Sequence, residues 1–175
     1  FIKNFWEEKK MVGAMSPSSK FLAQKMLKNI DFKKAKLIVE LGPGTGVFTK
    51  KILEQLAGDA KLLVFELNEG FYQLLQQEIQ DDRLILIHDS AEKIAEYIQQ
   101  EGFLYADYIV SSLPLANFPK KLVNSLLSES YRVLKNQGKF VQFQYSLVSK
   151  KHLENQFQSV HVSFAPINFP PAFVY

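Results

Sequence analysis

A short apolar run that ends in closely spaced glycines constrains this chain more than any other feature. Residues 36–41 read Lys-Leu-Ile-Val-Glu-Leu, and Gly42, Gly44 and Gly46 follow directly. Such a run predicts a buried strand, and the glycines allow a sharp turn and close approach of the backbone to a ligand. Val47 stands where a dinucleotide-binding G-x-G-x-x-G loop needs glycine, and the Gly-Lys-Ser/Thr of a Walker loop is absent. The loop therefore matches neither of these common pyrophosphate-binding motifs.

Apolar runs alternate with segments of helical periodicity along the rest of the chain. Strands are predicted at residues 36–41, 61–65, 84–87, 107–111, 139–145, 160–165 and 172–175. Helices are predicted at 20–30 (capped by Ser18 or Ser19), 47–56, 69–79 and 91–100, and from Pro119 through a buried stripe that includes Tyr131 and Leu134. We expect an α/β, Rossmann-like fold: a seven-stranded, mostly parallel sheet with an antiparallel C-terminal edge hairpin, helices on both faces and extra N-terminal helices.

Length and charge divide the chain into two parts. The 175 residues predict one domain, 1–175, with basic amphipathic helices at 1–36 and the core at 37–175. Residues 1–36 carry nine lysines and three acidic residues, a charge of +6, so the remainder carries −3 of the net +3. This basic start indicates an anionic partner, either a membrane surface or nucleic acid, or simply a solvated helix face. The absence of cysteine excludes disulfides and zinc-thiolate sites.

Three acidic residues lie at the ends of the first three predicted strands. Glu40 precedes the glycine loop, Glu66 stands 20 residues after Gly46, and Asp89 follows the third strand. The carboxyl ends of parallel strands share one edge, so these groups should line one site. An acid beside the loop suits a cationic amino group, a carboxylate after the second strand suits a ribose diol, and Asp89 with neighbouring amides can read adenine. Each alone could be a helix cap, but the ordered set points to S-adenosylmethionine.

The segment Ser111–Pro119 follows the fourth predicted strand, where a methyl acceptor should lie. A turn with two prolines holds main-chain carbonyls in fixed positions, and such carbonyls can accept a hydrogen bond from an amine and orient its lone pair. The sulfonium methyl is already activated, so positioning is the main requirement. Tyr145 is our prediction for the group that takes the amine proton. A tyrosine with a pKa of about 10 is a poor base, so water, alone or bridging to a loop carbonyl, is the alternative.

These motifs resemble those of class I S-adenosylmethionine-dependent methyltransferases. More narrowly, the chain resembles the bacterial phospholipid N-methyltransferases, which convert phosphatidylethanolamine stepwise to phosphatidylcholine and are related to the ribosomal RNA adenine dimethyltransferases. The narrower resemblance rests on residues 12–23, 39–49, 111–119, 140–145 and 168–175, which together span essentially the whole chain. The chain departs from the phospholipid pattern at Ser112 and at Gln144.

The resemblance implies S-adenosyl-L-methionine as cofactor, S-adenosyl-L-homocysteine as product, and no metal. Glu40 and the glycines would hold the methionine part, Glu66 the ribose and Asp89 with Ser90 the adenine. The predicted cofactor-binding residues are Ser18, Ser19, Glu40, Gly42, Gly44, Thr45, Gly46, Glu66, Leu67, Asp89, Ser90, Ala91 and Ser111. The predicted catalytic residues are Ser112, Leu113 and Tyr145, and the predicted substrate-binding residues are Pro114, Phe118 and Tyr145.

Phospholipid methylation would also explain the basic, aromatic start of the chain. Apolar residues there would insert into a bilayer while lysines meet anionic headgroups. The predicted membrane residues are Phe1, Ile2, Lys3, Phe5, Trp6, Lys9 and Lys10. Phe118 and Tyr145 would hold a methylated ammonium by cation–π attraction. We therefore expect a monomeric cytoplasmic enzyme, peripherally associated with the inner face of the cell membrane.

Adenine methylation in RNA is the main alternative, with the same lysines meeting phosphates. Amino-methylating nucleic-acid enzymes generally place an aromatic residue after the proline of the acceptor loop, to stack the base. Leu115 occupies that position here, and we also expect the chain to lack the additional C-terminal domain of the rRNA enzymes. A small-molecule amine acceptor and a non-catalytic cofactor-binding scaffold are the remaining alternatives.

Overall fold

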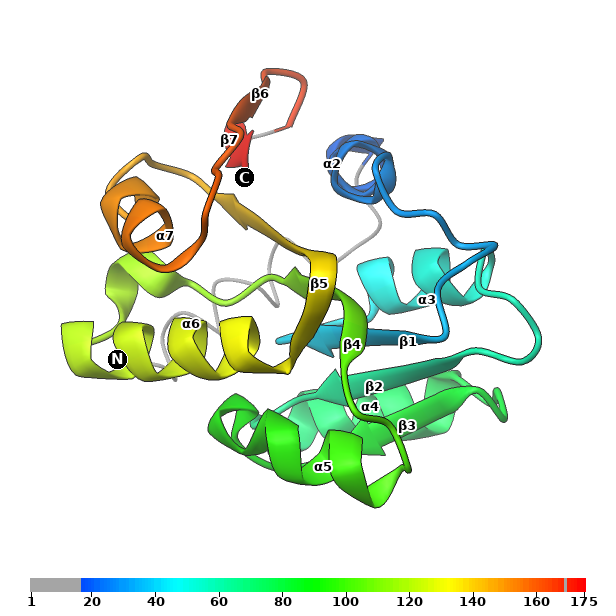
Figure 1. Ribbon diagram of the computed structural model, residues 1–175. Coiled ribbons are helices and arrows are strands. Elements are labelled where there is room, and N and C mark those ends of the chain that lie inside the picture. The colour runs from blue at the N-terminus through cyan, green and yellow to red at the C-terminus, as the bar shows by residue number, and fades with distance from the viewer. Residues whose placement is uncertain (1–16, 169) are drawn as a thin grey trace.

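The computed structural model describes residues 17–168 and 170–175, and for residues 17–20 it describes the backbone alone. In this part of the chain seven strands form one sheet in the order β3-β2-β1-β4-β5-β7-β6 (Figure 1). They are β1 (Leu37–Leu41), β2 (Lys61–Phe65), β3 (Leu84–Ile87), β4 (Ala106–Ser111), β5 (Leu134–Gln144), β6 (Ser163–Ala165) and β7 (Ala172–Val174). Strands β1 to β5 pair in parallel, whereas β7 pairs antiparallel with β5 and β6. The predicted Rossmann-like sheet with an antiparallel edge hairpin is confirmed.

Helices connect the strands on both faces of the sheet. They are α2 (Pro17–Leu27), α3 (Val47–Leu53), α4 (Glu69–Glu78), α5 (Ile94–Gln100), α6 (Lys120–Val133) and α7 (Lys150–Gln156), with short 3-10 helices η1 (Ala91–Lys93) and η2 (Leu115–Asn117). The predicted serine cap of α2 is wrong, because the helix already begins at Pro17, a residue suited to the first helical turn. The segment predicted as one helix over 91–100 begins as the 3-10 turn η1.

The C-terminal half of the chain departs most from the predicted bounds. Leu134 does not extend the buried stripe of α6, because it begins β5 and pairs there with Ala106 of β4. Tyr131, also predicted in that stripe, is 41% exposed. Helix α7 was not predicted, and Leu153 is the one residue that it buries. These differences have a common cause, since pairing and packing with distant segments decided each of them.

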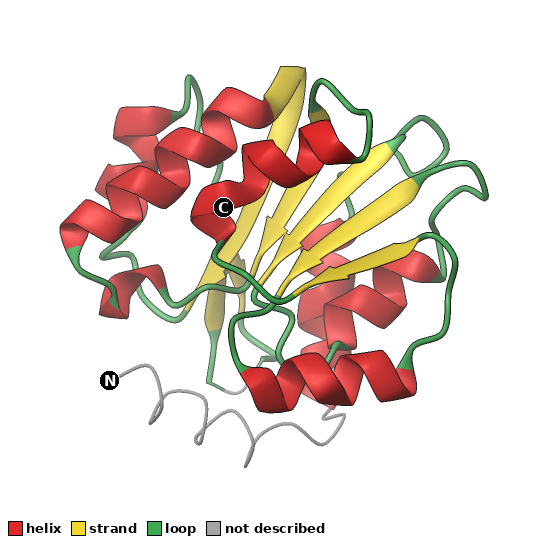
Figure 2. Ribbon diagram, turned by 90° about the horizontal axis from the view of Figure 1, so that it is seen from below, coloured by secondary structure: helices red, strands yellow, loops and turns green. Residues whose placement is uncertain are grey.

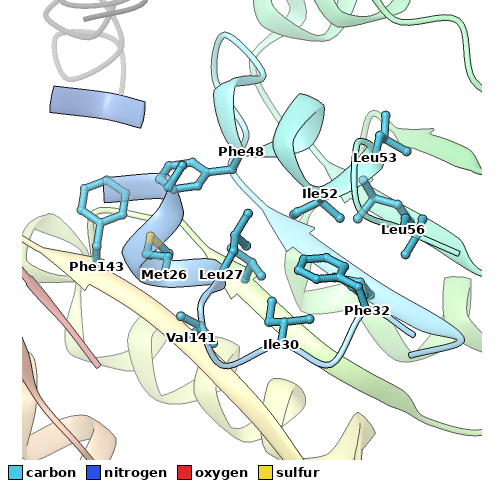
Figure 3. Close-up of a cluster of buried hydrophobic side chains, with 14 of the residues drawn as sticks. Met26, Leu27, Ile30, Phe32, Phe48, Ile52, Leu53, Leu56, Val141 and Phe143 are labelled. Atoms are coloured by element: carbon cyan, nitrogen blue, oxygen red, sulfur yellow. The ribbon is translucent and has the colours of Figure 1, made fainter. Parts of the chain in front are cut away.

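Helices cover both faces of the sheet (Figure 2). Alternating strand residues contribute to two hydrophobic clusters, one on each face. On one face Ile38 and Val64 join side chains of α2 and α3, and Figure 3 shows Met26, Phe48 and Phe143 of this cluster. On the other face Leu37, Val39, Leu63 and Phe65 pack with residues of α5 and with Val133 of α6. Burial on both faces explains why β1 and β2 read as continuous apolar runs instead of alternating ones.

Helices α6 and α7 run side by side in the same direction and begin at the carboxyl edge of the sheet. Near their starts, Nδ1 of His152 lies 3.3 Å from Oδ1 of Asn124. Near their ends, the rings of Tyr131 and Phe157 are in edge contact, with centroids 5.8 Å apart. The loop after β4 and the loop after β5 therefore meet at one edge, beside the glycine loop after β1.

Candidate functional site

The glycine loop between β1 and α3 is held in left-handed backbone conformations. Gly42, Gly44 and Gly46 have φ angles of 70°, 59° and 79°. A Cβ atom on Gly42 would lie 2.8 Å from Cδ2 of Leu113, and one on Gly46 would lie 2.5 Å from Cδ2 of Leu75. Backbone conformation and close packing thus both require glycine. The loop presents bare main chain at the carboxyl edge of β1, where open α/β sheets bind ligands.

Two carboxylates are buried beside this loop. The side chains of Glu40 on β1 and Glu66 after β2 are both 0% exposed. Oε2 of Glu66 accepts a hydrogen bond from the N–H of Gly44 at 3.1 Å, and Oε1 accepts one from the N–H of Asn68 at 2.8 Å. Burying carboxylates is costly for a fold, so two of them at the ligand edge indicate a site for a polar ligand with amino or hydroxyl groups.

Asp89 follows β3 and anchors its own loop. Its carboxylate accepts hydrogen bonds from Lys93 Nζ at 2.9 Å, from the Ser90 N–H at 2.7 Å and from the Tyr97 hydroxyl at 3.0 Å. The bond from Lys93 contributes most to holding the pKa of Asp89 below its ordinary value, so this carboxylate is ionised. The 3-10 helix η1 begins at Ala91, and the hydroxyl of Ser90 caps it by accepting a hydrogen bond from the N–H of Glu92. Asp89 thus fixes the conformation of the loop after β3 through contacts within the protein.

Leu67 supplies an apolar surface next to this loop. Its side chain is 60% exposed, and its carbonyl lies 3.2 Å from Nε2 of His88, directly before Asp89. A large aliphatic side chain exposed between Glu66 and the β3 loop is a surface that a flat heterocycle would cover.

The loop after β4 is pinned by two glutamines of β5. Nε2 of Gln142 and Nε2 of Gln144 donate to the carbonyl of Leu113 at 3.1 and 2.8 Å, and the N–H of Leu115 donates to it at 2.9 Å. Oε1 of Gln144 accepts in turn from the N–H of Ala116 at 3.3 Å. Both glutamine side chains are buried. The carbonyl of Leu113, predicted as catalytic, therefore already has three donors.

Ser112 retains unused hydrogen-bonding capacity at the centre of this edge. Its N–H donates to the carbonyl of Leu41 at 2.9 Å, which joins the loop after β4 to the end of β1. Its hydroxyl is buried and has no hydrogen-bond partner among the described residues. The neighbouring Ser111 is 0% exposed, and its hydroxyl accepts from the N–H of Leu113 at 3.3 Å. A buried hydroxyl without a partner is unfavourable, so Ser112 is suited to a polar group of a ligand.

Leu115 faces away from the ligand edge. It is 3% exposed and packs in a small cluster with Val123, Leu127 and Leu153. Phe118, the aromatic residue of this loop, is half-buried against the same cluster, and Pro114 is half-buried before it. Leu115, which stands where a base-stacking aromatic residue would be expected, is thus part of the hydrophobic core.

Tyr145 lies directly after β5, with its ring in edge contact with Phe143 at a centroid distance of 5.6 Å. The side chain is 48% exposed. Burial of the hydroxyl raises its pKa, although a hydrogen bond with Asn168 opposes the shift. A raised pKa makes the phenol a poorer base than free tyrosine. Tyr145 is therefore placed for contact with an acceptor but is poorly suited to the predicted proton-accepting role.

The structure brings most of the predicted site residues to one edge. Glu40, the glycine loop with Thr45, Glu66, Leu67, Asp89 and residues 111–114 all lie at the carboxyl ends of β1 to β4. Gln142 and Gln144 were missed as functional residues, although two polar residues at alternate positions of a buried strand were a usable signal. The side chains of Ser18 and Ser19 lie outside the described residues, as do the predicted membrane residues from Phe1 to Lys10.

Fold and site together define a class I S-adenosylmethionine-dependent methyltransferase. Residues 14–153 match the family model described as ribosomal RNA adenine dimethylase. The chain belongs to this family.

Two relatives by sequence carry different descriptions. Over 100% of this chain and 92% of the relative, the chain is 30% identical to the ornithine lipid N-methyltransferase of Singulisphaera acidiphila. It is also 28% identical to ribosomal RNA small subunit methyltransferase A of Clostridium acetobutylicum, over 61% of this chain and 37% of that relative.

Solved structures show the same fold at low sequence identity. The N-methyltransferase NodS from Bradyrhizobium japonicum aligns with a TM-score of 0.72 at 11% identity, covering 91% of this chain and 95% of NodS. Human N-acetylserotonin methyltransferase, in complex with its methyl donor, aligns with a TM-score of 0.60 at 14% identity, covering 97% of this chain and 54% of the human protein. The family match over residues 14–153, together with this fold, identifies the chain as an enzyme whose cofactor is S-adenosylmethionine.

The residues at the site fit this cofactor. The glycine loop at Gly42 and Gly46, with the buried carboxylate of Glu40 beside it, suits an amino acid. The buried carboxylate of Glu66 suits a ribose, and the exposed Leu67 suits an adenine. Among the described residues, no group of three or more His, Asp or Glu side chains is placed to hold a metal ion. No helix in the same part of the chain is long and apolar enough to cross a membrane.

Proposed function

We propose that this enzyme methylates the primary amine of a membrane lipid headgroup, such as the ethanolamine of phosphatidylethanolamine, at the cytoplasmic membrane surface. The observation that carries the proposal is the burial of Leu115. A base-methylating site needs a flat, exposed side chain on which the target base stacks. Leu115 and Phe118 instead pack into the cluster beneath the acceptor loop, so neither is such a side chain.

The full-length similarity to the ornithine lipid N-methyltransferase of Singulisphaera acidiphila supports the same proposal. Ornithine lipid and phosphatidylethanolamine share one relevant feature, a primary aliphatic amine at the membrane surface. The proposal concerns that shared amine, and the experiment below distinguishes the two headgroups.

The proposed chemistry depends on positioning. The bound cofactor supplies an electrophilic methyl group on its sulfonium. The buried hydroxyl of Ser112 accepts a hydrogen bond from the acceptor amine, and the nitrogen lone pair is thereby turned toward the cofactor side of the edge. The glutamine pair Gln142 and Gln144 holds this loop still. Tyr145 contacts the amine as it becomes a methylated ammonium, by cation–π attraction, and water takes the released proton.

Adenine methylation in ribosomal RNA is the second candidate. Its support is the family model over residues 14–153 and the similarity to ribosomal RNA small subunit methyltransferase A, of which the chain covers 37%. The predicted membrane lysines Lys3, Lys9 and Lys10 would serve phosphate contact as well as they would serve lipid contact. The burial of Leu115 is the feature that weighs against it.

The test is methyl transfer from labelled cofactor to vesicles of defined composition. Phosphatidylglycerol vesicles would contain phosphatidylethanolamine, ornithine lipid or no amine lipid, and a parallel reaction would contain purified small-subunit ribosomal RNA. We expect label in one or both amine lipids and none in the RNA or in the amine-free vesicles. Label in RNA alone, from a folded and cofactor-binding enzyme, would overturn the proposal in favour of the second candidate.

A further inference from the structure

Four large apolar side chains are exposed at the edge where the acceptor loop opens. Tyr145, Leu147 and Val148 follow β5 and are 48%, 47% and 70% exposed, and Ile167, between β6 and β7, is 66% exposed. β5 and β6 both run antiparallel to β7, so the turn that holds Ile167 lies at the same edge as the end of β5 (Figure 1). The pairing of Gln144 with Phe173 joins the end of β5 to the start of β7, beside this turn.

Four exposed lysines surround these apolar residues. Lys120 and Lys121 begin α6, and Lys150 and Lys151 lie at the start of α7. Since α6 and α7 run side by side in the same direction, both pairs lie at this edge. Lys150 bonds Glu154 one turn along α7, but residues 112–127, 140–153 and 163–175 contain no acidic residue. On the cofactor side of the same edge stand Glu40, Glu66, Glu69, Asp89 and Glu92. The edge is therefore basic on the acceptor side and acidic on the cofactor side.

We infer that this acceptor edge, formed by Tyr145, Leu147, Val148, Ile167, Lys120, Lys121, Lys150 and Lys151, docks on an anionic lipid bilayer. Exposed apolar side chains bordered by an excess of lysines over acidic residues have the composition of an interfacial membrane contact. A lipid amine can reach Ser112 only if the acceptor loop faces the headgroups, and this docking turns it toward them. The inference rests on the proposed function and adds a contact that is separate from residues 1–10.

The chain has no cysteine, so a single introduced cysteine is a unique site for an environment-sensitive fluorophore. Val148→Cys and Ile167→Cys place the probe on the acceptor edge. Leu104→Cys is the matched control, since Leu104 is an exposed aliphatic residue two positions before the first residue of β4, at the end of that strand opposite to the acceptor edge. The vesicles are phosphatidylcholine with about 30% phosphatidylglycerol, which contain no primary amine.

We expect these vesicles to shift the emission of the probe at 148 and 167 to shorter wavelength, and to leave the probe at 104 unchanged. Equal emission changes at 148 and 104, or none at 148, would overturn the inference.

Lys150→Gln with Lys151→Gln tests the charge separately. Vesicle affinity should fall about tenfold, whereas Lys33→Gln with Lys34→Gln, before β1, should change it less than about twofold. Equal losses in the two double variants would contradict the assignment.

These readouts separate the inference from the proposed function. Emission shifts at 148 and 167 without label in any amine lipid would leave the docking surface standing and refute lipid methylation. Methylation of detergent-dispersed amine lipid, with the probe at 148 still in water beside vesicles, would refute the docking surface and leave the proposed function standing.

Discussion

The main-chain N–H of Gly44 donates a 3.1 Å hydrogen bond to the buried carboxylate of Glu66. This bond joins the glycine loop after β1 to the end of β2, so the two parts of the cofactor site are built as one unit. The carboxylate of Glu66 also accepts from the N–H of Asn68 at 2.8 Å, which fixes its position before any ligand arrives. Such preorganisation lowers the entropy lost on binding.

Glu66→Gln should weaken cofactor binding by about 10- to 100-fold, because hydrogen bonds to a charged acceptor contribute about 1.5–3 kcal/mol each. Calorimetric titration with S-adenosylhomocysteine measures the change. Glu96→Gln, on the exposed face of α5, is the control and should bind like the wild type. Equal affinity of the two variants would show that Glu66 does not contact the ligand.

Gly46→Ala should lower the free energy of unfolding by about 1–3 kcal/mol, because Gly46 combines a φ of 79° with a Cβ position 2.5 Å from Leu75. Gly58→Ala is the matched control, since a Cβ there meets no atom within 4 Å. Urea denaturation of both variants gives the comparison. If both unfold at the same urea concentration, the strain assigned to the loop is absent.

Gln144→Leu should slow methyl transfer about 10- to 100-fold while changing cofactor affinity less than about twofold. The substitution removes donors to the carbonyls of Leu113 and Phe143 and an acceptor for the N–H of Ala116, which frees the acceptor loop but leaves the glycine loop intact. Single-turnover kinetics and cofactor titration separate these two effects. Gln99→Leu, on the surface of α5, is the control, and a parallel loss of cofactor binding in Gln144→Leu would contradict a role in positioning the acceptor.

Asp81→Asn should destabilise the fold by about 1 kcal/mol near neutral pH. Arg83 bonds Asp81 and also donates to the carbonyls of Leu53 and Leu56 at the end of α3, and the bond from Arg83 lowers the pKa of Asp81 to about 2. A lowered folded-state pKa stabilises the protein above the unfolded value of about 4. The advantage of wild type over Asp81→Asn should therefore shrink as the pH falls from about 4 toward 2. Asp82→Asn, at the exposed neighbouring residue, is the control variant.

The sequence correctly predicted those strands and turns whose formation depends mainly on residues close together in the chain. The bounds of β2 and β3 match the prediction, because each is a short apolar run between polar residues. The glycine loop was also identified correctly, since its backbone geometry depends on glycine itself. The ordered acidic residues and the family resemblance both predicted the cofactor, and the fold and family agree with it.

The rest depended on contacts between distant segments. Helix α7 buries Leu153 alone, so its sequence has no apolar periodicity to detect. The glutamine pair bonds a carbonyl 29 and 31 residues away, and nothing local to β5 reveals that partner. The sequence showed that Leu115 stands where a base-stacking aromatic residue would be expected, but only its packing against α6 and α7 shows that this position lies in the core.

The most direct test of the central claim is a competition in one reaction. Anionic vesicles that contain phosphatidylethanolamine and ornithine lipid would be mixed with small-subunit ribosomal RNA, enzyme and labelled S-adenosylmethionine, and the label in each acceptor would be counted. We predict label in the amine lipids, with its loss in Ser112→Ala at unchanged cofactor affinity. Label that accumulates in the RNA while both lipids stay unmodified would contradict the account.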